Sequence, residues 1–107
     1  MSKTTILIVE DEAIVAADLA GKLGQLGYEV AGTSAAGEEA VELACRLLPR
    51  VVLMDIRLKG SMDGIEAAEA IRRRVNVPVI YLTAPFRFRH PEPGHGQRAV
   101  RLYPETL

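Results

Sequence analysis

The chain has 107 residues, of which 49% are hydrophobic and 25% are charged. This length supports one domain with a single core, and the composition is that of an ordinary globular protein. The formal net charge of -1 gives no electrostatic argument for binding nucleic acid or a membrane surface. The apolar runs are only strand-sized, so we expect no membrane span. Without a signal peptide and with a single cysteine, Cys45, the chain is expected to be cytoplasmic.

The composition changes abruptly after Ala84. Residues 1–84 hold nine basic and twelve acidic side chains, whereas residues 85–107 hold four basic and two acidic ones. Four of the six prolines lie in this last stretch, where they interrupt any regular period. We therefore predict an incomplete folded domain over residues 1–84, followed by an irregular tail containing proline and arginine over residues 85–107.

Strands and helices alternate along the first half of the predicted domain. An apolar run predicts a strand from Thr4 to Val9, and a helix follows over residues 12–26 and ends at Gly27. A second strand is predicted from Tyr28 to Thr33, and a second helix over residues 37–48. The side chains expected to face the core from these helices are Val15, Leu19, Leu23, Leu26, Ala40, Val41, Ala44 and one of Leu47 and Leu48.

The second half repeats this alternation. Val51 to Met54 form the third predicted strand, and after a loop Asp63 begins a third helix, with Glu66 placed for a capping box. Pro78 to Leu82 form the fourth predicted strand. The order of strands and helices, with short connections, predicts right-handed crossovers and a parallel sheet. The side chains expected to be buried from the third helix are Ile65, Ala68 and Ile71.

Two of the apolar strands run directly into acidic residues. Glu10 and Asp11 follow the first strand, and Asp55 follows the third. Ligands of open parallel sheets bind beyond the carboxyl ends of the strands, so these carboxylates are expected at one edge. Because burying them without a partner or a cation is costly, the pattern predicts a divalent cation site. The structural alternatives are a turn-forming role for Asp55 and helix capping by Glu10 and Asp11.

Three segments together resemble the receiver domain of response regulators, the aspartate-phosphorylated switch of two-component signalling. They are ILIVEDE with Glu10 and Asp11, VVLMDIRLKGSMDGIEAAEAIR with Asp55, and VPVIYLTA with Thr83. The resemblance covers residues 4–84, and its motifs agree in order, spacing and strand position. It implies a flavodoxin-like α/β fold, a doubly wound parallel sheet with strand order 2-1-3-4, in which the fifth strand and the last helices are missing or altered.

The resemblance also implies a role for each acidic residue. Asp55 would accept a phosphoryl group from a histidine kinase or a phosphotransfer protein in a phosphorelay. Glu10, Asp11 and Asp55 would hold Mg²⁺, with the backbone carbonyl of Arg57 as a further ligand. A hard cation prefers oxygen ligands and reverses the local potential that would otherwise repel an incoming phosphoryl group.

Beyond the fourth strand, Thr83 and Ala84 would bind the phosphoryl group and act in the switch. The family continues with a fourth helix, a fifth strand that ends in a lysine–proline pair, and a fifth helix, and this lysine contacts the phosphoryl group. No lysine follows Lys59 in this chain, so no catalytic lysine is found. Its loss removes a charge-assisted contact worth on the order of 1.5–3 kcal/mol.

A one-base slip of the reading frame accounts for this departure. If the tail PFRFRHPEPGHGQRAVRLYPETL is back-translated and one base is dropped, permitted third bases can read HSDSATLNRATGSEPYGYILKPF, which resembles the missing receiver segment. We therefore hypothesise a frame-shift near Ala84, which nucleotides unable to encode the shifted string would refute. In the present frame the fourth strand is expected to be an uncovered sheet edge that favours self-association.

Two other functions stay open. An aspartyl-phosphate phosphatase also uses a strand-end Asp and Mg²⁺, but such enzymes usually place a second Asp where this chain has Arg57. A pseudo-receiver would act through protein contacts without phosphorylation; the missing lysine favours this function, and the three acidic residues oppose it. No enzymatic or nucleic-acid-binding output domain is predicted, so we expect neither enzyme activity nor direct nucleic-acid binding.

Overall fold

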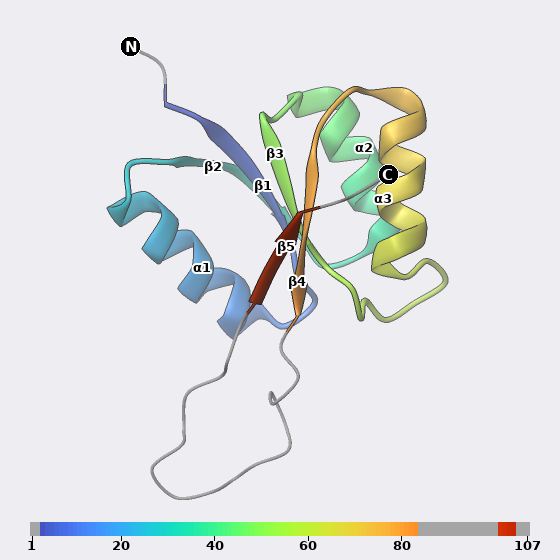
Figure 1. The fold of residues 1–107 in the computed structure, drawn as a ribbon. Helices are drawn as coiled ribbons and strands as arrows, with labels where there is room; N and C mark the ends of the chain where they lie inside the picture. Colours follow the sequence, from blue (N-terminus) through green and yellow to red (C-terminus); the bar gives the residue numbers. More distant parts are fainter. Residues whose placement is uncertain (1–2, 84–100, 105–107) are drawn as a thin grey trace, which may run out of the picture.

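Figure 1 shows a computed structural model of the chain, in which residues 3–83 and 101–104 are described. For Thr83 and for residues 101–104 the description concerns the backbone alone. The elements of the described residues, in chain order, are β1 (Thr5–Val9), α1 (Ala13–Gln25), β2 (Glu29–Ser34), α2 (Gly37–Leu47), β3 (Val51–Asp55), α3 (Gly64–Arg74), β4 (Val79–Thr83) and β5 (Arg101–Pro104).

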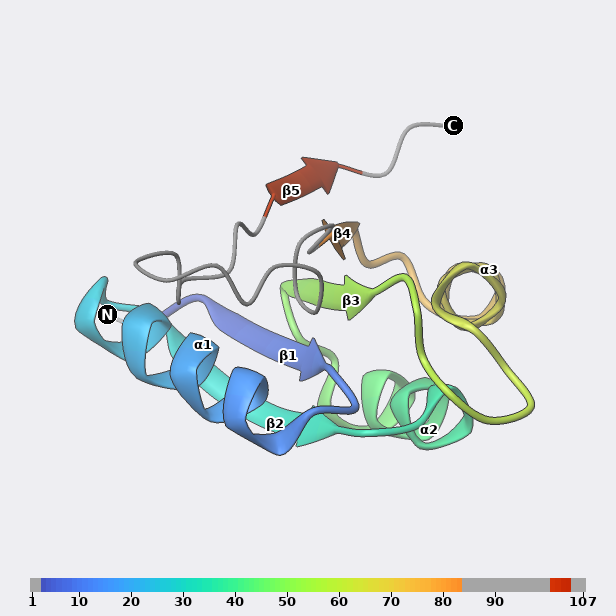
Figure 2. The ribbon, with the colours of Figure 1, turned by 90° about the horizontal axis from the view of Figure 1, so that it is seen from below.

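The strands form one sheet in the order β2-β1-β3-β4-β5. The first four are parallel, which confirms the predicted strand order 2-1-3-4. Figures 1 and 2 show α1 on one side of the sheet and α2 and α3 on the other. This is the doubly wound arrangement that alternating strands and helices with right-handed crossovers produce.

The continuous apolar character of β1 follows from burial on both faces. Ile6 and Ile8 belong to the core beneath α1, together with Leu53 and Leu82. The residues that alternate with these point to the other face of the sheet, where they belong to the larger core beneath α2 and α3. That core includes Leu7, Val9, Val52, Met54 and Val79. A strand covered on both faces needs apolar residues at every position, so it shows no alternation in sequence.

The fifth strand is the main difference from the expected fold. β5 pairs antiparallel with β4, with Leu82 opposite Leu102 and Thr83 opposite Arg101. The expectation that β4 would be an uncovered edge is therefore wrong. Within the described strands, β2 and β5 form the sheet edges. A strand of four residues that ends in Pro104 is too short to show a hydrophobic period in the sequence. Its backbone pairs with the backbone groups of β4 that would otherwise be unpaired. The rest of the predicted tail lies outside the described residues.

Leu26 and Ile65, which were expected in the core, are instead exposed, and so are both Leu47 and Leu48, of which one was expected to face inward. Leu26 is 72% exposed because α1 ends at Gln25 and the chain turns away at Gly27, whose φ is +96°. Leu48 is 61% exposed at the end of α2, and Ile65 is 47% exposed. The buried residues of α3 are instead Gly64, Ala67, Ala68 and Ile71.

Candidate functional site

The predicted carboxylate cluster forms at the carboxyl edge of the sheet. β1 and β3 are neighbours with Val9 opposite Met54, so the residues that follow them come out side by side. Glu10, Asp11 and Asp55 each offer a carboxylate oxygen, and these three atoms lie within 4.8 Å of one another. Glu10 and Asp55 are each only 3% exposed, which makes them two of the few buried charged residues in the described chain.

Backbone amides fix two of these carboxylates. The amide of Glu12 donates to Oε2 of Glu10 at 3.0 Å, and the amide of Arg57 donates to Oδ1 of Asp55 at 3.1 Å. The backbone of Glu10 is anchored in turn, because its amide donates to the carbonyl of Ser34 at the end of β2 at 2.9 Å. Such bonds restrict the rotation of a carboxylate and fix its orientation.

Asp11 differs from its two neighbours. Its Oδ1 atom is buried and has no hydrogen-bond partner among the described residues. The N-cap residue of α1 is Glu12, and its side chain makes no capping bond. Asp11 therefore does not cap the helix, contrary to the structural alternative. A buried carboxylate oxygen without a partner, next to two further carboxylates, is the environment that a hard cation stabilises.

The cluster fits a magnesium-type ion in its chemistry and its dimensions. Mg²⁺ bonds oxygen at about 2.0–2.1 Å and Ca²⁺ at about 2.3–2.6 Å, so ligands on opposite sides of such ions are separated by roughly 4–5 Å. The three carboxylate oxygens lie within 4.8 Å of one another, so one such ion could contact an oxygen of each. Arg57 lies on the loop that follows β3, two residues after Asp55, and its backbone carbonyl is a candidate ligand.

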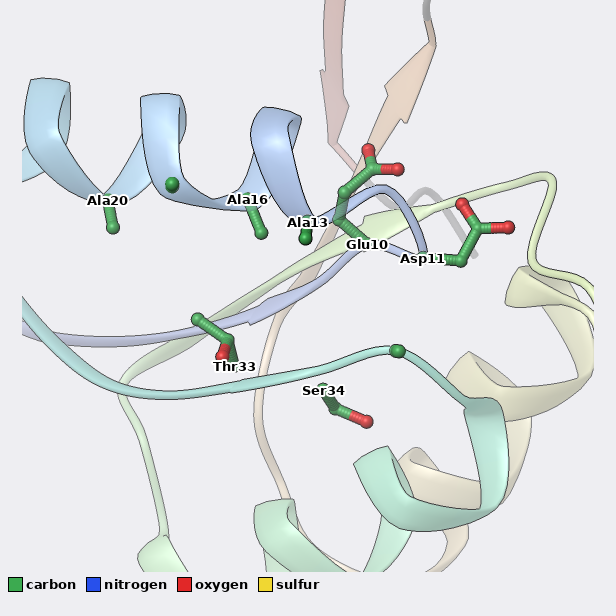
Figure 3. A pocket seen from close by; sticks show the side chains of 9 residues that line it. Glu10, Asp11, Ala13, Ala16, Ala20, Thr33 and Ser34 are labelled. Atoms are coloured by element: carbon green, nitrogen blue, oxygen red, sulfur yellow. The ribbon is translucent and has the colours of Figure 1, made fainter.

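A groove leads away from the cluster between α1 and the end of β2. Its volume is about 410 Å³. Figure 3 shows Glu10 and Asp11 at one end of this groove, with small side chains of α1 facing Thr33 and Ser34. The alanines that line it are Ala13, Ala16, Ala17, Ala20 and Ala35. Small side chains here leave the approach to the carboxylates open along the first helix.

The loop between β3 and α3 is tied to two helices. Asp63 and Glu66 form the predicted capping box at the start of α3, with the amide of Glu66 donating to Asp63 at 2.8 Å. The Ser61 hydroxyl donates to the carboxylate of Glu38 on α2, and this bond lowers the pKa of Glu38 from its ordinary value of 4.5. The end of this loop that leads into α3 is therefore held by contacts to both helices.

Sequence reasoning missed Gly64, which starts α3 directly behind Asp55. A Cβ atom at this position would meet the carbonyl carbon of Asp55 at 2.9 Å and the Cα atom of Ile56 at 2.8 Å. The only signal in the sequence is the Asp-Gly pair at the predicted helix start. That pair is common at turns and does not reveal a close approach between two backbones.

Of the two predicted phosphoryl-binding residues after the fourth strand, the structure describes only the backbone of Thr83. Thr83 ends β4, and Leu82 is the register partner of Asp55, so the backbone of Thr83 lies one residue beyond it at the same edge. Ala84 lies outside the described residues.

A parallel 2-1-3-4 sheet with an acidic cluster at its carboxyl edge is the arrangement expected of a signalling receiver domain. Residues 6–87 match the response regulator receiver domain family, and the chain belongs to this family. The match begins within β1 and extends past β4, so it includes every predicted motif of the site.

Individual relatives are response regulators of greater length. The chain is 44% identical over 79 residues to the transcriptional regulatory protein PdtaR of Mycobacterium tuberculosis, covering 74% of this chain and 38% of PdtaR. It is 39% identical over 96 residues to the phyllosphere-induced regulator PhyR of Methylorubrum extorquens, covering 85% of this chain and 36% of PhyR. The chain thus spans little more than a third of the length of these two relatives.

Solved structures agree with this assignment. The signal receiver domain of a modulated diguanylate cyclase from Desulfovibrio desulfuricans G20 superposes with a TM-score of 0.73 at 43% identity, covering 76% of this chain and 65% of that one. The anti-anti-sigma factor PhyR of Bartonella quintana, complexed with the anti-sigma factor NepR, superposes with a TM-score of 0.77 at 30% identity. That match covers 98% of this chain and 43% of PhyR.

One relative carries an enzymatic name. The protein-glutamate methylesterase/protein-glutamine glutaminase of Archaeoglobus fulgidus is 37% identical over 79 residues, which are 74% of this chain and 22% of the enzyme.

Among the described residues, no helix is long and apolar enough to cross a membrane.

Proposed function

We propose that this receiver domain accepts a phosphoryl group on Asp55 in a phosphorelay. The observation that carries the proposal is the cluster of three carboxylates at the carboxyl edge of a parallel sheet, within 4.8 Å of one another. Asp55 is the last residue of the central strand β3, and its orientation is held by the Arg57 amide. We propose Mg²⁺ as the cofactor, held by the three carboxylates and the Arg57 carbonyl.

The proposed donor is the phosphohistidine of a histidine kinase or a phosphotransfer protein. A carboxylate oxygen of Asp55 bonds to phosphorus while the phosphorus–nitrogen bond of phosphohistidine breaks. The electron pair returns to the imidazole nitrogen, which takes up a proton from solvent. Bound Mg²⁺ supplies positive charge that offsets the charges of the phosphoryl oxygens. What the protein contributes is therefore mainly position and charge.

The surface beside the site suits a protein donor. Ile14, in the first turn of α1, is 85% exposed and stands three residues after Asp11. We propose that this exposed apolar side chain contacts the donor protein, because apolar side chains occupy the buried centre of protein interfaces. Thr83 and Ala84 are proposed to bind the phosphoryl oxygens from the neighbouring strand end, as the family resemblance implies.

A second candidate function is partner binding without phosphorylation. The absence of any lysine after Lys59 favours it. So does the similarity to PhyR of Bartonella quintana, which was solved in complex with an anti-sigma factor. In that case the acidic cluster would serve the fold alone, and the chain would act through its helix surfaces.

Intact-mass spectrometry after incubation with acetyl phosphate and Mg²⁺ separates these functions. We expect the unchanged chain to gain the mass of one phosphoryl group and the Asp55→Asn variant to gain none. Asp18→Asn is the matched control, because Asp18 is an exposed aspartate on α1 that pairs with Lys22. No gain in a folded, unchanged chain would contradict phosphoryl transfer and favour partner binding.

A further inference from the structure

We infer that Gly64 is a positioning residue for Asp55, because the start of α3 rests directly on the backbone that carries the acceptor carboxylate. This inference rests on the proposed function of Asp55. Gly64 is buried, and its amide donates to the carbonyl of Ile56 at 3.1 Å. The peptide between Asp55 and Ile56 is therefore in direct contact with the first residue of α3.

The requirement for glycine here is one of space. Of the glycines in the described chain, only Gly27 and Gly60 have a positive φ, so Gly64 adopts a backbone conformation that any residue can adopt. A Cβ atom at Gly64 would nevertheless overlap the Asp55 carbonyl oxygen, and it would lie under 3.0 Å from two further backbone atoms. Backbone atoms cannot rotate away as a flexible side chain can, so either α3 or the Asp55–Ile56 peptide must move.

Several contacts resist movement of α3. The capping box of Asp63 and Glu66 fixes its first turn. Ala67, Ala68 and Ile71 are fully buried in the core that α3 shares with α2 and the sheet. Protein interiors are close-packed, so a displacement of one residue is passed on to its neighbours.

The Asp55–Ile56 peptide is held less firmly on its other side. It lies at the very end of the ladder between β3 and β4, where the Ile56 amide donates to the carbonyl of Leu82 at 3.5 Å, a long bond. An alanine at position 64 is therefore expected to displace Asp55 more than α3. Misplacement of a reacting group by about 1 Å can cost on the order of 100-fold in rate.

Gly37 offers a matched comparison. It is the first residue of α2, as Gly64 is of α3, and both are buried. A Cβ atom at Gly37 would meet the side chain of Met62 at 3.0 Å and its carbonyl oxygen at 3.0 Å. Gly37→Ala thus crowds a helix start against the loop without touching the backbone of Asp55. Ile71→Val is a second control, which loosens the packing of α3 far from the carboxylates.

The test compares Gly64→Ala, Gly37→Ala and Ile71→Val in the full chain, by Mn²⁺ titration and by the initial rate of phosphoryl gain from acetyl phosphate. We expect Gly64→Ala to lose about 10-fold in Mn²⁺ affinity and about 100-fold in rate, as changes behind a ligand typically do. The two controls should stay within about threefold of the unchanged chain, even where their unfolding temperatures fall equally. A folded Gly64→Ala that binds Mn²⁺ and gains phosphoryl at the normal rate would overturn the inference.

Two further comparisons cover a variant that fails to fold and an unchanged chain that gains no phosphoryl group. Gly24→Ala adds a Cβ atom at an exposed position of α1, where no atom from elsewhere in the chain lies within 4 Å. Because alanine favours the helix over glycine, this change can be combined with a weakly folded variant to stabilise it. If Gly64→Ala fails to fold even there, the glycine is needed for folding and the positioning role is refuted. If the unchanged chain binds Mn²⁺ but gains no phosphoryl group, the proposed function fails. The Mn²⁺ affinity still tests the positioning role in that case, because a normal affinity in Gly64→Ala would overturn it.

Discussion

At Asp11, one carboxylate oxygen is buried and lacks a hydrogen-bond partner among the described residues. Asp11, Glu10 and Asp55 each offer a carboxylate oxygen within 4.8 Å of the other two, so three acidic groups share a small volume. Like charges at this separation destabilise one another unless a cation intervenes. The metal-free fold therefore carries an electrostatic cost at this residue that a bound ion removes.

Asp11→Asn is expected to stabilise the metal-free chain and to abolish most of its response to Mg²⁺. The unchanged chain should gain about 1–3 kcal/mol of unfolding free energy in excess Mg²⁺, as ligand binding to the folded state requires. Urea unfolding in Mg²⁺ and in a chelator measures both effects, with Asp18→Asn as the control. An unchanged chain whose stability ignores Mg²⁺ would rule out a cation site here.

Leu48 ends α2 in the left-handed conformation, with φ of 49° and ψ of 58°. This conformation costs an L-residue about 1–2 kcal/mol, and the 61% exposed side chain gains little packing in return. We expect Leu48→Gly to raise the unfolding free energy by about 0.5–1 kcal/mol, and Leu47→Gly, inside the helix, to lower it. Urea denaturation measures both; a destabilised Leu48→Gly would show that the leucine makes contacts that outweigh its strain.

At the scale of elements, the capping box makes α3 sensitive to Asp63. Its side chain accepts from the amide of Glu66 at 2.8 Å, and the Glu66 side chain accepts from the amide of Asp63 at 3.0 Å. Asp63→Ala should cost about 1 kcal/mol of unfolding free energy. Glu69→Ala, on the exposed face of the same helix, should change it by less than about 0.5 kcal/mol. Equal effects of the two changes in thermal unfolding would show that the cap contributes nothing.

β5 protects the edge of β4. Deleting residues 101–107 removes the antiparallel partner of Ile80, Tyr81, Leu82 and Thr83. The exposed apolar strand should then pair between chains, because unpaired edge groups are a template for association. Sedimentation velocity at increasing concentration is expected to show larger species for the shortened chain than for the full one. Two identical, monomeric profiles would mean that β5 does not cover this edge in solution.

At the scale of the molecule, the parts of the fold that repeat along the chain could be predicted from sequence. Continuous apolar runs marked β1 and β3 because both faces of these strands are buried, and the acidic residues after them marked the site. Right-handed crossovers are compatible with several orders of four parallel strands, and the order 2-1-3-4 was implied by the resemblance to the receiver family. The capping box was predictable because it depends only on residues three positions apart.

Features that depend on contacts between distant backbones could not be predicted. Gly64 looks like any helix-start glycine until the chain brings it against Asp55. Ile65 follows the helical period as well as Ala67 does, and only the rotation of α3 on the sheet selects between them. β5 is too short to show a period, and it forms because β4 offers unpaired groups.

The frame-shift hypothesis yields a prediction for the whole domain. Replacing residues 85–107 with HSDSATLNRATGSEPYGYILKPF would supply the lysine that the family places beside the phosphoryl group. Its charge-assisted contact is worth on the order of 1.5–3 kcal/mol. We expect the restored chain to unfold at a higher temperature and to gain phosphoryl groups faster than the present chain. A restored chain that is less stable would argue that the two segments are unrelated.

The central claim is that Asp55 is the residue that accepts the phosphoryl group. Tandem mass spectrometry of peptides from the chain, after brief incubation with a phosphohistidine donor protein and Mg²⁺, locates the group directly. We expect the added mass on the peptide fragment that contains Asp55 and on no other acidic residue of the cluster. An added mass on Glu10, on Asp11 or outside the cluster, or none in a folded sample, would contradict the assignment.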